Sequence, residues 1–362
     1  MTVSATDVER RMVYHSPQAE GYTCWVGAWI TPEGTIRVTF HQATGPLTGR
    51  PMAPRAFRET FGWPPPGLSP GYDMTGTMQQ VITLDSADGG FTWNIVATEP
   101  FHTPMNGVMQ GYCALPDGTV LRTSWGMYLP FYDVPQTGYV QRSTDGGETW
   151  GPPVVLVDPA KGIALPKRAH VLRDGRILVT GGYFAYSDEV TNWAQGLSHI
   201  DSVLWLSSDD GATWSEPIVV RASNATSPPT EESDAAELPD GRLLVIERAS
   251  APPPRWQTVL KPEGGTYVVE RQGAAPFPHS GQPDVLATRE GVVLHIASSN
   301  ISWTADAGQT WTDLGLGTLY YPCSVQVPDG RILSFCHRGS DDPFDGSVDQ
   351  QIEVVSFRLK VE

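Results

Sequence analysis

Several basic and imidazole side chains stand where they could move protons or neutralise charge. Arg168 and His170 lie two residues apart, His337 is followed directly by Arg338, and His279 stands in a Pro-His-Ser-Gly-Gln-Pro segment. An imidazole can act as a general acid or base near neutral pH, and an arginine can pair with a carboxylate. Each of these residues would equally serve as a hydrogen-bonded structural group. Because the sequence has no His-Glu-x-x-His or Cys-x-x-Cys spacing, we predict neither a metal nor another cofactor.

Aromatic side chains are frequent in three long segments, which cover residues 41–80, 124–137 and 181–200. Flat rings such as those of Trp125 and Tyr183 can stack on the apolar faces of sugars, and they can equally pack the segments against one another. Long loops on a rigid scaffold are where binding sites usually lie. We therefore predict that these segments surround a glycan-binding site.

The composition excludes several classes of protein. Acidic residues outnumber basic ones by 40 to 24, and the resulting net charge of −16 would repel a polyanionic nucleic acid. No run approaches the roughly 18 consecutive apolar residues of a membrane-spanning helix. The first residues contain no apolar signal-peptide core, so we expect a cytoplasmic protein, or a secreted one if a leader has been removed. A neutral or weakly charged ligand remains as the partner, and the oligomeric state stays open.

The elements that must position these residues follow from a repeat. An apolar strand, an acidic residue–Gly turn and a second apolar strand recur at residues 30–39, 115–123, 172–180, 238–247, 287–297 and 327–336. Asp-Gly between alternating apolar runs is the strongest short-range hairpin signal, so six copies predict six equivalent sheets. With a two-residue Asp329-Gly330 turn, Cys323 and Cys336 would face each other in the last hairpin, as a disulfide or as two free thiols.

A second repeat, Ser/Thr-x-Asp-x-Gly-x-Thr-Trp, follows the hairpins and is called the Asp box below. Its copies lie at residues 86–93, 143–150, 207–214 and 304–311, with a degenerate copy at residues 260–267. The Ser/Thr and Asp side chains can satisfy backbone groups of the turn, the Gly can take a left-handed conformation, and the Trp can pack between layers. We interpret the Asp boxes as structural turns rather than as chemical groups.

The Asp boxes, in register with the hairpins, make the chain resemble the sialidase (neuraminidase) superfamily over nearly its whole length. The resemblance implies an all-β, six-bladed β-propeller of four-stranded antiparallel blades, with residues 1–362 as one domain. The acidic-Gly turn would join the first two strands of a blade, and the Asp box the last two. Only one strand, in residues 350–362, follows the last hairpin, so we expect residues 8–16 to supply the missing strand. Ring closure of this kind hides sheet edges that invite aggregation.

The same resemblance assigns roles around a central pocket. Glu232, followed after one hairpin by Arg248, matches the Glu that polarises a tyrosine nucleophile and the Arg that binds the substrate carboxylate. Tyr321, beside Tyr320, precedes the sixth hairpin where that nucleophile would lie, and Asp73 in the long first loop matches the general acid/base. The predicted catalytic residues are Glu232, Tyr321, Asp73 and His170, and the predicted substrate-binding residues are Arg248, Arg168, His279, Arg338, Trp125 and Tyr183.

The chain also departs from the sialidase pattern. Where that family carries an Arg in the first strand of blade one, counting back from Gly34 gives Cys24. Blade five has no Arg after its second strand, in residues 295–304. Glu231 leaves the register of the blade-four match open by one residue. Since each bidentate arginine contributes a strong charge-assisted pair, the loss of two predicts a divergent protein that is not a typical sialidase.

Three functions fit this pattern. The first, which we favour, is a glycoside hydrolase of sialidase-like fold that acts on a non-sialic glycoside with Glu232 and Asp73. The second is a polysaccharide lyase, in which His and Tyr move protons while Arg neutralises a uronate carboxylate. The third is a non-catalytic glycan-binding propeller, since a fold alone does not imply a function. Each of the three takes an oligosaccharide or glycoside and needs no cofactor.

Overall fold

Nearly all the regular secondary structure in the described part of the chain is β-strand. The computed structural model describes residues 1–17, 21–46, 49–62, 75–100, 111–126, 137–224, 229–249, 255–277, 282–298, 300–338 and 351–362. Two short helices occur in these ranges, α1 (Arg55–Phe61) and α2 (Trp193–Gly196). Over the same ranges, no helix has the length and apolar character that crossing a membrane requires.

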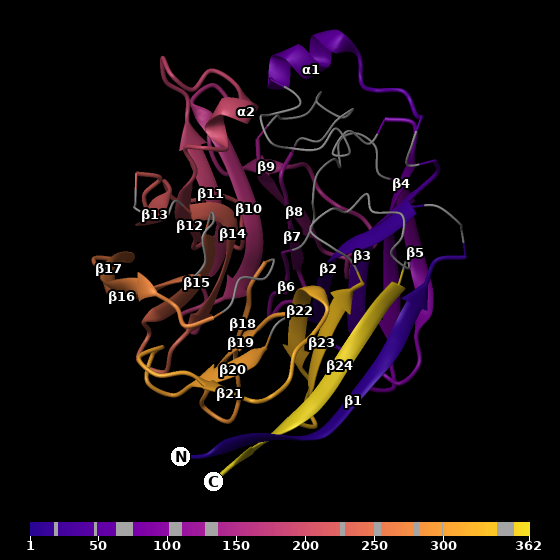
Figure 1. The fold of residues 1–362 in the computed structure, drawn as a ribbon, viewed down its shortest axis with the longest axis vertical. Coiled ribbons are helices and arrows are strands. Elements are labelled where there is room, and N and C mark those ends of the chain that lie inside the picture. The colour runs from indigo at the N-terminus through magenta and orange to yellow at the C-terminus, as the bar shows by residue number, and fades with distance from the viewer. Residues whose placement is uncertain are drawn as a thin grey trace.

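Six four-stranded antiparallel sheets form the blades of a propeller, as predicted (Figure 1). Blade one contains β2 (Gly21–Ile30), β3 (Ile36–Thr44), β4 (Met78–Ser86) and β5 (Asn94–Pro100). Blade two contains β6 (Tyr112–Ala114), β7 (Val120–Ser124), β8 (Tyr139–Ser143) and β9 (Val154–Val155). Blade three contains β10 (Gly162–Val171), β11 (Ile177–Ala185), β12 (Asp201–Ser207) and β13 (Ile218–Arg221). Blade four contains β14 (Pro229–Glu237), β15 (Leu243–Ala249), β16 (Trp256–Glu263) and β17 (Thr266–Ala274). Blade five contains β18 (Asp284–Ala287), β19 (Val293–Ile296), β20 (Ile301–Thr304) and β21 (Thr312–Asp313).

Blade six closes the ring with strands from both ends of the chain. It contains β22 (Tyr320–Gln326), β23 (Ile332–His337) and β24 (Gln351–Val361), and its outer strand is β1 (Val3–His15). Figure 1 shows indigo β1 beside yellow β24, with the two chain ends next to each other. The predicted closure by an N-terminal strand is therefore confirmed, and the strand begins earlier than the expected residue 8.

The hairpin turns contain one residue more than expected. In the last hairpin, the amide of Gly330 donates to the carbonyl of Val327, and the amide of Val327 donates to the carbonyl of Arg331, each at 2.9 Å. Three residues therefore form the loop, and Gly330 takes the left-handed conformation with a φ of 93°. A type I turn followed by a left-handed glycine has this geometry. The same pair of hydrogen bonds closes the other five hairpins.

The extra turn residue shifts the strand register by one. Cys323 lies opposite Phe335, and Cys336 belongs to the other face of the hairpin. The prediction that the two cysteines face each other is therefore wrong, because it assumed a two-residue turn. All four cysteines are free and buried.

The Asp boxes are turns that satisfy their own backbone. In residues 86–93, the hydroxyl of Ser86 donates to Asp88 at 2.7 Å and accepts from the amide of Gly90 at 2.8 Å. Asp88 also accepts from the amide and the hydroxyl of Thr92, at 2.9 and 2.6 Å. The copies at residues 143–150, 207–214 and 304–311 repeat this pattern. The side chains therefore perform the structural role that the sequence predicts.

The hydrophobic core is divided among the interfaces between neighbouring blades. In the described residues, one cluster joins each consecutive pair of blades, including blades six and one. The tryptophans of the Asp boxes belong to these clusters: Trp93, Trp150, Trp214 and Trp311 pack at the interface with the preceding blade. Each blade therefore depends on both neighbours for its buried surface.

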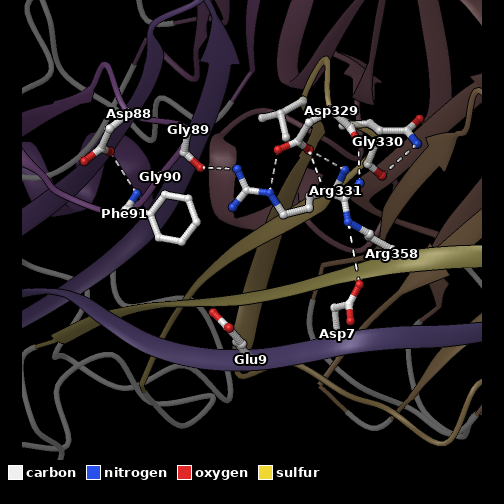
Figure 2. A network of polar contacts seen from close by, with 12 residues as sticks. Asp7, Glu9, Asp88, Gly89, Gly90, Phe91, Asp329, Gly330, Arg331 and Arg358 are labelled. Carbon is white, nitrogen blue, oxygen red and sulfur yellow. Dashed lines mark hydrogen bonds and ion pairs between the residues drawn. The ribbon is translucent and has the colours of Figure 1, made fainter.

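Arginines near the hairpin turns also tie blades together. Arg176 of blade three donates to the carbonyl of Gly265 in blade four at 2.7 Å, and Arg37 of blade one donates to that of Gly146 in blade two. At the ring closure, Arg331 of blade six donates to the carbonyl of Gly89 in blade one at 2.9 Å (Figure 2). These contacts place the hairpin turns and the Asp boxes at the same end of the propeller.

Four of the innermost strands are bulged near the opposite end. Their registers slip between Cys24 and Gly27 in β2, between Pro166 and Ala169 in β10, between Pro229 and Ser233 in β14, and between Tyr320 and Cys323 in β22. Trp25 and Tyr321, the first residues within two of these slips, have φ values of 55° and 51°. A bulge re-aims a side chain and often stands beside a functional site.

Candidate active site

The bulges of β14 and β22 bring a glutamate and a tyrosine together in the hub. The hydroxyl of Tyr321 donates to Glu232 Oε1 at 2.5 Å. Arg248, at the end of β15, donates through Nη1 to Glu232 Oε2 at 2.7 Å and lies 3.4 Å from the Tyr321 hydroxyl. Glu232 is buried, with 5% of its surface exposed. The structure thus joins three predicted site residues from blades four and six, and the glutamate that bonds to Tyr321 and Arg248 is Glu232.

The charge of Glu232 is held by its neighbours. Burial by itself would raise the pKa of this carboxyl, but the charges of Arg248 and Lys167 and the hydrogen bonds from Arg248 and Tyr321 lower it to about 2. The charge of Glu232 in turn raises the pKa of Arg248. Glu232 is therefore a carboxylate at any working pH, aimed at a phenol that must lose a proton before it can act as a nucleophile.

A second acid–base pair lies beside the first. Lys167, in the bulge of β10, is buried with its Nζ 3.7 Å from Glu231 Oε1 and 4.1 Å from the centre of the Trp125 ring. Burial lowers the pKa of Lys167 and raises that of Glu231, and in each case the charge of the partner opposes the shift. Trp125, which we predicted to bind substrate, thus lies near Glu232, Arg248 and Tyr321 through its contact with Lys167.

The sequence pointed to His337 but not to two further residues of this site, Trp25 and Arg255. Trp25 is clustered with Cys24 and Ala43, against which Trp125 and Tyr321 pack. Counting back from Gly34 gave Cys24 as the matching position. The bulge inserts one extra residue into β2, and within it the backbone of Trp25 takes a φ of 55°. His337 lies with its ring centre 5.5 Å from that of Tyr321. Arg255 is almost fully buried, its pKa is lowered by burial to about 9, and the charge of Glu232 opposes that shift.

Nothing in the sequence around Arg255 marks it, because it belongs to neither repeat and precedes β16, the third strand of blade four. Trp25 could have been found, since any one-residue bulge in the first strand exchanges Cys24 for its neighbour.

Other predicted residues lie elsewhere. His170 bonds through Nε2 to Asp234 Oδ1 at 2.6 Å, in a hub cavity whose lining does not include Glu232, Arg248 or Tyr321. It sits one residue short of the end of β10, toward the hairpin turns, and so the strand carries it away from the bulge. Arg168 lines the same cavity. Tyr183 lines a different cavity, between blades two and three, together with Trp214 and Glu216.

Arg338 is half-exposed, and its Nη2 lies 3.9 Å from Glu353 on β24. Asp73 and His279 lie outside the described residues. Within the described ranges, no three His, Cys, Asp or Glu side chains are grouped as a metal site would require.

Comparisons with known proteins yield similar structures without similar sequences. No protein-family model and no curated protein matches the chain. A protein of unknown function from Dyadobacter fermentans is 20% identical, with 99% of both chains covered and a TM-score of 0.65. The GH93 α-L-arabinofuranosidase of Fusarium graminearum, solved with arabinobiose, is 14% identical over 97% of this chain and 98% of its own, with a TM-score of 0.62.

The intramolecular trans-sialidase of Ruminococcus gnavus is 11% identical over 96% of each chain, with a TM-score of 0.60. At such identities the likeness concerns the fold. The chain thus has the six-bladed propeller fold that is also found in sialidases and arabinofuranosidases.

Proposed function

We propose that this protein is a glycoside hydrolase that acts on a non-sialic glycoside, and that its substrate pocket lies at the bulged end of the hub, around Glu232, Arg248 and Tyr321. The observation that carries the proposal is the hydrogen bond of 2.5 Å from Tyr321 to Glu232, with Arg248 bonded to the same carboxylate. A nucleophile bonded to a base that a third group orients is the usual arrangement for covalent catalysis. The solved propellers of similar fold include one with arabinobiose, which supports a glycan substrate.

The residues would share the chemistry in two steps. In the first, the Tyr321 oxygen attacks the anomeric carbon, the bond to the leaving group breaks, and Glu232 takes the phenol proton. In the second, water displaces Tyr321 from the sugar and gives a proton to the carboxylate that protonated the leaving group, while Glu232 returns its proton to the Tyr321 oxygen. The leaving-group oxygen needs a proton in the first step, and Asp73 remains our proposed donor. Arg248 would keep Glu232 charged and aligned between turnovers.

The proposed restriction to non-sialic sugars follows from the other residues of the pocket. A sialic acid needs cationic partners for its carboxylate, and Arg248 is already bonded to Glu232. Trp25 occupies the bulge of blade one, and an indole has no positive charge with which to form an ion pair with a carboxylate. No Arg occurs between Arg289 and Arg331. Trp25 and Trp125 would instead offer apolar surface to the face of a neutral sugar.

The test is a panel of aryl glycosides that includes an α-L-arabinofuranoside, assayed with the wild type, Tyr321→Phe and the matched control Tyr320→Phe. We expect one neutral glycoside to be cleaved, Tyr321→Phe to lose at least about 10²-fold in rate, and Tyr320→Phe to keep most of it. A slow 2-fluoro glycoside should add the mass of one sugar to the wild type and none to Tyr321→Phe.

Two results would overturn the proposal. One is a Tyr321→Phe variant that cleaves as fast as the wild type. The other is a rise in ultraviolet absorbance when the protein is incubated with uronate polysaccharides, because an unsaturated uronide identifies a lyase.

A further inference from the structure

Arg168 spans the hub between opposite blades. It comes from the bulge of β10 in blade three, and its Nη2 donates to the carbonyl of Pro322 in blade six at 2.5 Å. Only 4% of its surface is exposed, and it lines a cavity of about 330 Å³ on the side of the hub away from Glu232. A buried guanidinium that reaches across the hub to a backbone carbonyl requires an explanation, because burying a cation is costly unless it is paired.

The carbonyl that Arg168 holds belongs to the residue after the proposed nucleophile. Tyr321 has a φ of 51°, a conformation that costs a bulky side chain free energy and persists only where the surroundings impose it. Pro322 has no amide hydrogen, so the bulge cannot be fixed through that group. Its carbonyl is the remaining backbone group of Pro322 that can take a hydrogen bond, and a charged donor makes that bond strong.

Carboxylates of two other blades compensate the charge of Arg168. Asp284, at the start of β18, has Oδ1 3.9 Å from Nη2 of Arg168. Asp234 of β14 accepts from His170 at 2.6 Å and from the amide of Val285 at 2.7 Å, which ties blades three, four and five together. Arg168 thus lies with these two acidic residues in the hub cavity, whose lining does not include Glu232 or Tyr321.

We propose that Arg168 is a positioning residue for Tyr321, which it serves by fixing the Pro322 carbonyl and with it the bulge that aims the phenol at Glu232. The inference rests on the proposed function, since it assigns Tyr321 as the nucleophile. It replaces our prediction that Arg168 binds substrate. Misplacement of a reacting group by about 1 Å can cost about 10²-fold in rate without affecting how the substrate binds.

The test compares Arg168→Met and Arg168→Lys with Arg289→Met, using the glycoside that the wild type cleaves. Arg289 is a matched control because it also donates to β22 and the residue after it, to Val327 at 3.0 Å and Gln326 at 3.4 Å, at the end of the strand far from Tyr321. We expect Arg168→Met to lower kcat about 10- to 100-fold with KM within about twofold, and to slow sugar transfer to Tyr321 equally. Arg168→Lys, which keeps one cationic donor, should recover part of the loss. Arg289→Met should keep the wild-type kcat.

The outcomes separate this inference from the proposed function. If Tyr321→Phe is inactive but Arg168→Met keeps the wild-type kcat, only the positioning role is refuted. If Arg168→Met raises KM and leaves kcat unchanged, the residue binds substrate and the inference is wrong. If Arg168→Met fails to fold, Arg168→Lys decides: a lowered kcat at unchanged KM supports the role, and wild-type kinetics refute it. If Tyr321→Phe keeps full activity, the proposed function itself fails.

Discussion

Two adjacent glutamates of β14 experience different surroundings. Glu232 accepts hydrogen bonds from Tyr321 and Arg248, whereas Glu231 lies 3.7 Å from the Nζ of Lys167. The pKa of Glu232 is lowered to about 2 by its cationic neighbours despite burial, and burial raises that of Glu231. Neighbours in sequence thus differ in the direction in which their pKa is shifted and in the partner that they face, which makes them a natural pair for mutagenesis.

The first prediction concerns this pair. Glu232→Gln keeps an acceptor for Tyr321 and Arg248 but removes the charge, so activity should fall about 10²- to 10⁴-fold with little change in Tm. Glu231→Gln is the matched control and should cost less than about tenfold. Steady-state rates and thermal melts of both variants provide the measurement. An unchanged rate with a lowered Tm for Glu232→Gln would make this residue structural.

The second prediction concerns specificity. Because Trp25 lies where a clamp arginine would be needed, a fluorogenic sialoside should not be turned over at a useful rate. The assay compares this sialoside with the neutral glycosides of the panel at equal concentration. Release of the fluorophore at about 1 s⁻¹ or faster, an ordinary enzymatic rate, would contradict our assignment of the pocket.

The third prediction concerns pH. Burial lowers the pKa of His337 to about 4, so the unfolded chain binds a proton at this residue below pH 6.5 while the folded protein does not. The contribution to stability is present above pH 6.5 and is lost as the pH falls towards 4, by up to about 3 kcal/mol.

Unfolding by denaturant between pH 7.5 and 4.5 measures this loss. His337→Phe should lose less stability over the range than the wild type, because it has no imidazole to protonate in the unfolded chain. An identical slope for His337→Phe and the wild type would show that His337 is not held neutral.

At the scale of the elements, the sequence predicts where strands turn and does not predict how they align. Each acidic-Gly turn occurs at its expected position, because glycine alone readily takes the left-handed conformation that ends the turn. The three-residue loop, however, moved Cys323 opposite Phe335. One additional residue in a turn shifts the strand pairing by one, so that each side chain after the turn lies on the opposite face of the sheet from the one expected.

The bulges limited the prediction of the site in the same way. The resemblance predicted Glu232, Arg248 and Tyr321. It rests on the number of residues between motifs and gives no information on bulges inside a strand. The count along the first strand gave Cys24 instead of its neighbour Trp25, because no sequence signal marks the bulge between Cys24 and Gly27. His170 lies three residues beyond Lys167, and over that distance an extended strand leaves the pocket for the hub cavity.

The fourth prediction tests an Asp box. Ser207 is buried, donates to Asp209 at 2.8 Å and accepts from the amide of Gly211 at 2.9 Å. Ser207→Ala leaves that buried amide without its partner, which should cost about 1–3 kcal/mol of unfolding free energy and leave activity unchanged. Ser208→Ala, at the exposed neighbouring position, is the control. Equal stability of the two variants would refute the structural role of the box.

At the scale of the whole molecule, the ring is joined where its two ends meet. Arg331 bonds to Asp329 at 2.8 Å and to the carbonyl of Gly89 in blade one at 2.9 Å, and Arg358 of β24 lies 3.7 Å from Asp7 of β1 (Figure 2). These polar contacts and the β1–β24 pairing together form the seam of the propeller, which is the place where strands from the two ends of the chain close the ring.

The fifth prediction follows from that seam. Removal of residues 1–16 would expose the edge of β24 along its whole length, and an open edge of this length pairs with other chains. The shortened protein should elute as large assemblies in size-exclusion chromatography, and a synthetic peptide of residues 1–16 should restore the wild-type elution volume. A shortened protein that elutes as the wild type does, without peptide, would contradict the role of β1.

The meeting of the two ends has a consequence for connectivity. Thr2 and Glu362 exchange two backbone hydrogen bonds of 2.9 Å, so a short linker could join them without moving either strand. Once joined, the chain would be a closed loop that could be cut at any exposed turn, such as the glycine pair at residues 264 and 265, to give a circular permutant of the same propeller. The blade at which the chain starts is, in this sense, independent of the order of the blades around the hub.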